Sequence, residues 1–311
     1  MRNTFSKKIE EYAEKDDRIV LLVGDVGFSV FENFKEKFPD RFFNTGISEQ
    51  NMIGLAAGLA LTGKKVFVYS IMPFVTYKVV EQLRNDLCYQ DLDVVVVGVG
   101  SGYTYGTSGF SHHGTEDIGV LKSLPNLTIL SPSDPEELRQ LLDCCLEYKH
   151  PVYIRLSKNN EPTFNKEKNV MIGKAYYIIK GNNKSNNKET DAALISHGNI
   201  MSEVMKAYEE LSKQSISVSV ISCPTIKPLD TTFIEKVLTS HKHIFVIEEH
   251  NKIGGLGESI GIIGNKQINQ IAINDTFMNV GGDLPYLRKV AGIDSENIIK
   301  TVKKVCSENK D

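Results

Sequence analysis

The sequence predicts an α/β protein with two domains, each a mainly parallel sheet covered by helices. Short runs of valine, isoleucine and leucine alternate with helical patterns along most of the chain. Such apolar runs are typical of strands that are buried on both faces, and helices between them favour parallel pairing. With 311 residues, the chain is long enough to form two hydrophobic cores.

The first domain is predicted at residues 1–160, where strands and helices alternate most regularly. After a polar, charged helix at 1–15, strands are expected at 19–23, 41–45, 66–69, 94–97, 127–130 and 152–155. Helices are expected at 31–38, 50–62, 74–88 and 134–148. This alternation places the carboxyl ends of the strands at one edge of the sheet, where the sites of α/β proteins gather.

The second domain is predicted at residues 191–311, after a linker and hairpin at 161–190. The polar segment 181–188 predicts the solvated tip of a hairpin between strands at 176–180 and 192–195. Further strands are expected at 218–221 and 244–247, a turn at 225–230 and a last helix at about 295–307. The glycines at 254–257 resemble an anion-binding turn, but the preceding carboxylates favour tight strand–helix packing there.

Composition and charge exclude several classes of protein. The formal net charge of −3 argues against binding to nucleic acid, which needs a clustered basic surface. No apolar run is long enough to span a membrane, and the charged N-terminal helix differs from a signal peptide. The five cysteines have no metal-type spacing, which favours a reduced, cytoplasmic protein without a metal site of its own.

The motif Gly-Ile-Ser-Glu-Gln at 46–50 places a carboxylate, Glu49, where a strand becomes a helix. The helix that follows is apolar all round, so we expect it to be buried on all sides, with Gly54 and Gly58 allowing close approach of another backbone. A carboxylate at the head of such a helix is poorly solvated, which suits an acid–base role. On the local pattern alone, the simpler interpretation is that Ser48 caps the helix and Glu49 interacts with its dipole.

Two further segments follow strands and carry chemically useful residues. Phe74 and Tyr77 share a helix face, although aromatic pairs at this spacing also belong to cores. The glycine-rich segment 98–114 ends in His112 and His113, which point apart on an extended chain, so at most one should face a site. This segment matches neither a dinucleotide fingerprint nor a P-loop, and a plain surface loop is the alternative to a functional one.

Together these segments resemble the C-terminal half of transketolase-like, thiamine diphosphate-dependent enzymes, over nearly the whole chain. The motifs occur in the order that the family has. They are Gly-Ile-Ser-Glu-Gln at 46–50, Phe-Val-Thr-Tyr at 74–77, Ser-His-His-Gly at 111–114, Leu-Pro-Asn at 124–126, Pro-Ser-Asp at 132–134, Glu-Glu-His at 248–250 and Gly-Gly-Leu-Gly at 254–257. The resemblance implies a pyrimidine-binding domain followed by a transketolase C-terminal domain.

The resemblance also implies how the chain binds and activates the cofactor, thiamine diphosphate. At the position of Glu49 the family has a glutamate hydrogen-bonded to N1′ of the aminopyrimidine ring, which promotes loss of the proton from C2 of the thiazolium ring. Phe74 matches the aromatic residue that stacks on the pyrimidine, Tyr77 a second aromatic residue, and Asp25 an acidic residue near the thiazolium. His112 matches a histidine that contacts sugar hydroxyls beside C2, so Glu49 and His112 are the expected catalytic residues.

The residues expected to bind the substrate differ from those of the family. Ser108 stands where transketolases have an aspartate, Gly100 where they have a histidine, and Lys158 where they have an arginine. Lysine lacks the bidentate fork of arginine. Ser29 keeps another phosphate contact, and Arg2 is left open as the last one. We therefore expect Ser29, Ser108 and Lys158, with the histidine named above, to bind sugars other than the standard pentose phosphates.

The diphosphate end of the cofactor is expected on another chain. The family holds the diphosphate through Mg²⁺ on a Gly-Asp-Gly motif and a later asparagine, and neither Gly-Asp-Val at 24–26 nor Gly-Asp-Leu at 282–284 matches that motif. The chain begins where the family's second domain begins, so it resembles one subunit of a split enzyme. The expected partner is an N-terminal transketolase-like subunit that supplies the Mg²⁺ ligands, in a heterotetramer of two plus two chains that share the cofactor.

The expected reaction is transfer of a two-carbon ketol unit from a ketose to an aldose, and related activities stay open. A deoxyxylulose-phosphate synthase is favoured faintly by His113 and by Asp-Ile at 117–118, whereas a 2-oxo acid dehydrogenase β-subunit would lack the Ser-His-His-Gly pattern. A non-catalytic partner subunit is the alternative from another class, and retention of Glu49, Phe74 and His112 argues against it. A nucleotide-binding α/β protein is disfavoured because no phosphate-binding fingerprint is present.

Overall fold

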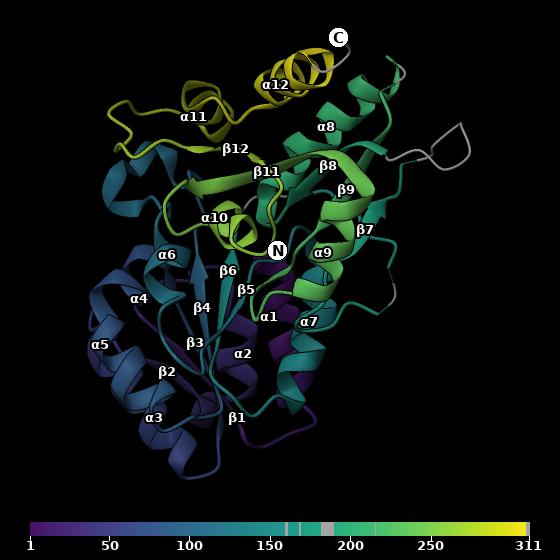
Figure 1. Cartoon of the computed structure of the whole chain (residues 1–311). Coiled ribbons are helices and arrows are strands. Elements are labelled where there is room, and N and C mark those ends of the chain that lie inside the picture. Colours follow the sequence, from purple (N-terminus) through teal and green to yellow (C-terminus); the bar gives the residue numbers. More distant parts are fainter. Residues whose placement is uncertain (159–160, 168, 182–189, 215, 309–311) are drawn as a thin grey trace.

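The computed structural model describes residues 1–158, 161–167, 169–181, 190–214 and 216–308. These residues form two sheets flanked by helices, and the second sheet lies above the first in Figure 1. The predicted fold of two mainly parallel, helix-covered sheets is confirmed. Within the described ranges, no helix combines the length and apolar character that crossing a bilayer requires.

The first sheet contains seven strands. They are β1 (Ile19–Val23), β2 (Phe42–Asn44), β3 (Lys65–Ile71), β4 (Val94–Val99), β5 (Thr128–Leu130), β6 (Val152–Leu156) and β10 (Thr225–Lys227). Their order is β10-β5-β6-β4-β3-β1-β2, and all neighbours are parallel except β10 and β5. The turn predicted at 225–230 is therefore wrong at its start, because β10 pairs with the edge of β5 that β6 leaves open.

Helices cover both faces of this sheet. They are α1 (Arg2–Ala13), α2 (Glu32–Lys37), α3 (Glu49–Leu61), α4 (Met72–Val75), α5 (Val80–Gln82), α6 (Asp117–Leu121) and α7 (Pro135–Glu147). One hydrophobic core lies on the side of α3 and contains Met52 and Ile53, and the other lies on the side of α1 and α7 and contains Phe5 and Leu138.

The single helix predicted at 74–88 is wrong. The segment consists of α4, a 3₁₀ turn at Tyr77–Val79, α5 and a π-helical stretch at Leu83–Cys88. At the end of α4 the hydroxyl of Thr76 donates to the Met72 carbonyl at 2.6 Å. Such side-chain bonds compete with the backbone pattern of a helix, which accounts for the break at this point.

The second sheet contains β7 (Tyr176–Ile179), β8 (Thr190–Ser196), β9 (Val218–Ser222), β11 (His241–Asn251) and β12 (Ile268–Ile273) in the order β12-β11-β8-β9-β7. The helices of this half are α8 (Met201–Ser212), α9 (Thr231–Ser240), α10 (Leu256–Gly261), α11 (Leu284–Ala291) and α12 (Ser295–Glu308). The hairpin predicted between 176–180 and 192–195 is wrong, because β11 and β9 occupy both edges of β8 and β7 pairs antiparallel with β9. Most of the hairpin tip predicted at 181–188, namely 182–188, lies outside the described residues.

Buried charges join the two halves of the molecule. Arg155, which is 1% exposed, donates from Nε to the carboxylate of Asp117 and from Nη2 to the carbonyls of Gly114 and Glu249. Glu249 in turn accepts hydrogen bonds from the backbone N–H of Tyr103 and from the guanidinium of Arg288. The glycine-rich segment of the first domain is thereby held against the second sheet. The predicted boundaries at residues 160 and 190 stay predictions.

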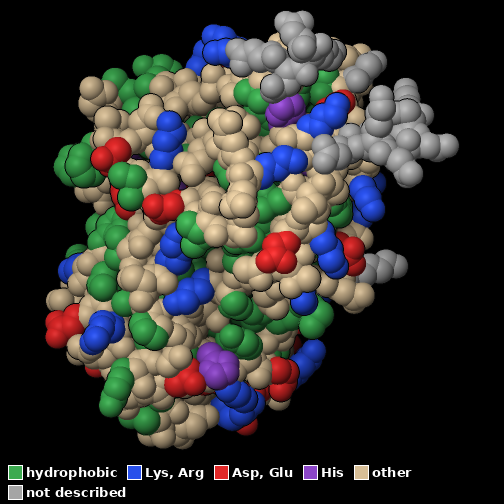
Figure 2. Space-filling model, in the orientation of Figure 1, with side chains coloured by type: hydrophobic (Ala, Val, Ile, Leu, Met, Phe, Trp, Pro, Cys, Tyr) green, Lys and Arg blue, Asp and Glu red, His purple; other side chains and the backbone are tan. Residues whose placement is uncertain are grey.

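The surface carries charges of both signs. On the described face that Figure 2 shows, lysine and arginine side chains are interspersed with carboxylates. This distribution agrees with the small net charge of the sequence.

Candidate active site

Glu49 is the first residue of α3, and its side chain is almost fully buried. The chain reaches it through a turn at Gly46, whose φ of +71° favours glycine, and only 1% of Glu49 is exposed. Ser48 stands at the N-cap position, but its hydroxyl donates to the Thr45 carbonyl at 2.6 Å and makes no capping bond to the helix. The simpler interpretation of Ser48 as a side-chain cap is therefore wrong.

The carboxylate of Glu49 pairs with a lysine that the sequence analysis did not single out. Nζ of Lys78 lies 2.7 Å from Oε2 of Glu49, and 46% of the Lys78 side chain is exposed. Lys78 follows Phe74 by four residues and carries the one charge of the segment 72–80. This isolated charge in an apolar segment was the signal that could have identified it.

The helix behind Glu49 is buried on one face only. Met52, Ile53 and Ala56 pack into the core, whereas Leu55 and Leu61 are 39% and 64% exposed. A Cβ atom added at Gly54 or Gly58 would meet nothing within 4 Å. The prediction that α3 is buried on all sides is thus wrong for this chain by itself, because no described element of the chain covers the outer face.

Phe74 and His112 are brought together by α4 and by the 3₁₀ turn at Phe110–His112. Their ring centroids lie 5.3 Å apart with an angle of 73° between the planes. The hydroxyl of Ser111 lies 3.1 Å from Nδ1 of His112. His113 is buried instead and packs against Tyr103, and burial lowers its pKa below the ordinary value for histidine. The two histidines thus have different neighbours, and the prediction that at most one of them faces a site stays a prediction.

The glycine-rich segment is tightly packed and is no plain surface loop. A Cβ at Gly102 would lie 2.3 Å from the side chain of Glu249, and one at Gly114 would lie 2.0 Å from Sδ of Met72. Gly102 also has a positive φ of +58°, which glycine adopts without strain. A side chain at Gly102 would displace Glu249 of the second domain, and one at Gly114 would displace Met72 within the first domain.

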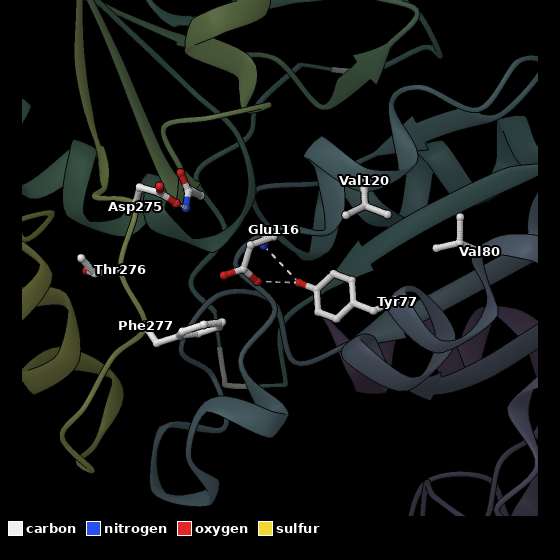
Figure 3. Close-up of a pocket in the computed structure, with 8 residues that line it drawn as sticks. Tyr77, Val80, Glu116, Val120, Asp275, Thr276 and Phe277 are labelled. Atoms are coloured by element: carbon white, nitrogen blue, oxygen red, sulfur yellow. Dashed lines mark hydrogen bonds between the residues drawn. The ribbon is translucent and has the colours of Figure 1, made fainter.

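Tyr77 lies between the two domains and is held by Glu116. Its hydroxyl donates to Oε2 of Glu116 at 2.9 Å and accepts from the backbone N–H of the same residue at 3.1 Å (Figure 3). Both residues line a cavity of about 480 Å³ that Phe277 of the second domain borders on the opposite side. Burial raises the pKa of Tyr77 above its ordinary value. Its predicted contact with the cofactor stays a prediction.

Asp25 and Ser29 lie in the exposed loop after β1. The backbone N–H of Asp25 donates to the Asn44 side chain, and the amide of Asn44 donates back to the Asp25 carboxylate at 3.1 Å. The backbone N–H of Ser29 donates to Glu32 at 2.5 Å. Asp25 and Ser29 have positive φ angles of +52° and +59°, which are uncommon outside glycine.

The other predicted substrate-binding residues lie near Tyr105. Nζ of Lys158 lies 4.2 Å from the centroid of the Tyr105 ring, and the same ring lies 6.1 Å from that of His112. Ser108 is exposed in the 3₁₀ turn at Gly106–Ser108. Lys158, Tyr105 and His112 therefore lie next to one another, although they come from distant parts of the sequence.

The glycine turn before α10 binds the chain's own carboxylate. Glu248 accepts from the backbone N–H groups of Leu256 at 2.7 Å and Gly257 at 2.9 Å. A Cβ at Gly255 would lie 2.4 Å from the same carboxylate. This arrangement is the tight strand–helix packing that the sequence favours. Among the residues that the structure describes, no group of three or more His, Cys, Asp or Glu side chains is arranged to hold a metal ion.

The fold and this site define a two-domain α/β protein of the transketolase type. Residues 1–163 match the family "Transketolase, pyrimidine binding domain", and residues 181–298 match "Transketolase, C-terminal domain". The chain therefore belongs to the transketolase family.

Individual relatives agree with this assignment. One subunit of the apulose-4-phosphate transketolase of Actinobacillus succinogenes is 33% identical over 91% of this chain and 90% of its own length. The 1-deoxy-D-xylulose-5-phosphate synthase of Listeria monocytogenes is 32% identical over 99% of this chain, which spans 50% of that enzyme. A solved structure titled "Split gene transketolase, inactive beta4 tetramer" superposes with a TM-score of 0.86 at 26% identity, over 98% of this chain and 97% of that one.

Proposed function

We propose that the chain is the C-terminal subunit of a split, thiamine diphosphate-dependent transketolase that moves a two-carbon ketol unit from a ketose to an aldose. The observation that carries this proposal is Glu49, a carboxyl group 1% exposed at the head of α3 with one oxygen turned to the half-exposed Lys78. Beside this segment, the rings of Phe74 and His112 are in contact. The chain belongs to the transketolase family, in which a glutamate, an aromatic residue and a histidine of this kind act together in one active site.

The residues present fit the aminopyrimidine end of the cofactor. When bound, thiamine diphosphate supplies a nucleophilic carbon that accepts the ketol unit. Glu49 would hold a proton at N1′ in a site with little water, and Phe74 would stack on the ring. His112 would orient the hydroxyls of the sugar, and Asp25 and Tyr77 would line the cofactor site.

We further propose a partner chain and an assembly of two plus two subunits. The partner is an N-terminal transketolase-like subunit that holds the diphosphate and its Mg²⁺. Two findings support this proposal: a relative of similar length is named as one subunit of its transketolase, and the similar solved structure is titled a split-gene transketolase. Cys88, Cys144, Cys145 and Cys223 are free thiols, which suits the reducing cytoplasm that we propose as the location.

The proposed substrates are sugars other than the standard pentose phosphates. Ser29, Ser108 and Lys158 are the proposed contacts, and Lys158 offers a single ammonium where a guanidinium would bind phosphate with two parallel bonds. The relative of Actinobacillus succinogenes is named for apulose 4-phosphate, which supports a non-standard sugar.

The variant Glu49→Gln tests the proposed function. Glutamine is nearly isosteric and can still form a hydrogen bond, but it cannot share a proton with N1′. General acid–base groups typically contribute ~10²–10⁴-fold to rates, so we expect a loss of that order in hydrogen–deuterium exchange at C2 of the cofactor. The exchange is followed by NMR in the chain assembled with its partner.

A matched control separates this role from a helix-dipole effect. Glu296 lies in the first turn of α12, so Glu296→Gln makes the same chemical change at another helix start. A dipole contact is worth about 0.3–1 kcal/mol of stability, and its loss leaves the exchange rate unchanged. If Glu49→Gln exchanges as fast as the parent protein, Glu49 is only a helix start and the proposal fails.

A further inference from the structure

Tyr77 borders open space in a segment that is not a regular α-helix. It begins the 3₁₀ turn that follows the break at the end of α4, so the packing of a long helix does not fix its side chain. With Val80 and Val120 it lines the cavity of about 480 Å³ between the two domains (Figure 3). The ring of Tyr77 therefore has room to rotate into this cavity unless other groups hold it.

A single residue, Glu116, holds the Tyr77 hydroxyl through two hydrogen bonds. Oε2 of Glu116 accepts from the hydroxyl at 2.9 Å, and the backbone N–H of Glu116 donates to the same hydroxyl oxygen at 3.1 Å. Burial and the carboxylates of Asp117 and Glu116 raise the pKa of Tyr77, so the hydroxyl keeps its proton and remains a donor. Two hydrogen bonds to one residue fix both the position and the direction of the phenol group.

Glu116 is itself held in place by both domains. Its other oxygen, Oε1, accepts from the hydroxyl of Thr115 at 2.8 Å. The carbonyl of Thr115 accepts from the backbone N–H of Asn251 in the second domain at 2.7 Å. The carbonyl of Gly114 accepts from Nη2 of Arg155, also at 2.7 Å. The backbone that carries Glu116 is thus anchored, and its carboxylate can hold Tyr77 in one place.

Glu116 also stands at the N-cap position of α6, which offers a simpler role for this residue. In that role its side chain would accept a hydrogen bond from a backbone N–H of the first turn, but no such bond is present in α6. Its two oxygens accept instead from the hydroxyl groups of Tyr77 and Thr115. The contacts of the carboxylate therefore favour a role in holding Tyr77 over a role in starting the helix.

We propose that Glu116 is a positioning residue, which holds the ring of Tyr77 where it lines the cofactor site. This inference rests on the proposed function, which puts Tyr77 in that site. A ring that is already held loses little freedom when the cofactor binds, and preorganised contacts of this kind raise affinity. Without the carboxylate of Glu116, the ring can rotate toward the cavity, and binding of the cofactor must first restore its position.

The test measures affinity for thiamine diphosphate with Mg²⁺ by calorimetry, in the chain assembled with its partner subunit. Tyr77→Phe keeps the ring and removes the hydroxyl, and Glu116→Ala removes the carboxylate. Each variant should bind the cofactor about tenfold more weakly, which corresponds to about 1.4 kcal/mol. Glu116→Gln should bind it within about threefold of the parent, because the amide oxygen can still accept from the hydroxyl.

The double variant of Tyr77→Phe with Glu116→Ala shows whether the two residues act through one interaction. If they do, its affinity equals that of either single variant, whereas independent effects would combine to a loss of about a hundredfold. The matched control is Tyr12→Phe, which removes another tyrosine–carboxylate bond, to Asp143 at 2.8 Å, and should leave cofactor affinity unchanged. Combined losses in the double variant, parental affinity in both single variants, or an equal loss in Tyr12→Phe overturns the proposal.

The ring itself is followed in the isolated chain by fluorine NMR after labelling with 3-fluorotyrosine. The signal that disappears in Tyr77→Phe belongs to Tyr77, and we expect it to shift in Glu116→Ala and to stay near its parental position in Glu116→Gln. An unchanged signal in Glu116→Ala overturns the proposal. An assembled parent that binds no thiamine diphosphate contradicts the proposed function together with this inference, whereas normal binding by the parent with unchanged affinity in both single variants contradicts this inference alone.

Discussion

The outer face of α3 provides the most direct test of assembly, through the variant Gly58→Leu. In the chain alone, a side chain at this position meets nothing, since an added Cβ has no neighbour within 4 Å. Replacing glycine inside a helix gains up to about 0.8–1 kcal/mol in helix propensity. The variant chain should therefore be as stable as the parent or slightly more stable.

Assembly should respond in the opposite direction. We infer that Gly54 and Gly58 allow another chain to pack closely on α3, where overpacking typically costs ~1–3 kcal/mol. At about 1.4 kcal/mol for each tenfold change, this cost weakens association by roughly five- to 150-fold per site. The exposed Leu55 and Leu61 beside these glycines would be part of the same contact.

The assay combines thermal unfolding of the chain with sedimentation velocity, with and without the partner subunit. Gly261→Leu is the matched control, because Gly261 ends the short helix α10 and an added Cβ there also meets nothing within 4 Å. Unimpaired association of Gly58→Leu would refute the inferred interface. A large loss of stability in the isolated variant would refute the premise that this helix face is open.

Two further predictions follow from charged groups. Lys78→Met removes the ammonium that lies 2.7 Å from the Glu49 carboxylate. Because a half-exposed ion pair contributes ~0.2–1 kcal/mol and the cofactor no longer has to displace it, the assembled enzyme should bind thiamine diphosphate up to about fivefold more tightly by calorimetry. Weaker binding would show instead that Lys78 positions the carboxylate. Burial raises the pKa of Glu137 from 4.5 to about 7, so its contribution to stability is complete below pH 4.5 and is lost as the pH rises through 7. The free energy of unfolding, measured in denaturant from pH 5 to 8, should fall by up to ~3 kcal/mol in the parent, and Glu137→Gln should remove this dependence on pH. The control Glu136→Gln changes a neighbour whose pKa is lowered by Arg139 and should leave the dependence in place. An equal slope in Glu137→Gln would contradict this assignment.

Most strands of the first domain could be predicted because both of their faces are buried. They are mainly apolar runs whose ends are marked by polar or glycine residues, as at Ile19–Val23. Which strands pair with each other could not be predicted from such runs. The three residues of β10 are as compatible with a turn as with a strand, and they form a strand because they pair with the open edge of β5. In the same way, β7 pairs with β9 because β8 has no free edge, which local pattern cannot reveal.

The candidate site could be predicted where one residue type determines the chemistry. Glu49 follows a strand and starts an apolar helix, and its near-complete burial follows from that position. The contacts of Lys78 and Tyr105 could not be predicted, because each depends on where a different segment passes. By sequence, Gly100 only marks the place of a missing histidine, whereas in the structure its lack of a side chain is what admits the Tyr105 ring.

Apolar side chains are uncovered in the loop after β1, in the turn before Glu49 and at the end of α3, while the Glu49 carboxylate is buried, and these facts together favour a surface that another chain completes. Ile47, Phe28 and Leu61 are 79%, 73% and 64% exposed, and exposure of large apolar side chains to water is unfavourable unless another molecule covers them. The buried carboxylate of Glu49 pairs with Lys78, whose long side chain can move into solvent when another group approaches. A second chain packed over Ile47, two residues before Glu49, would exclude water from the Glu49 carboxylate, and exclusion of water strengthens every polar contact made there. Assembly and acid–base function are thus expected to fail together in Gly58→Leu, whereas Glu49→Gln should separate them by abolishing exchange at C2 in a normally assembled enzyme.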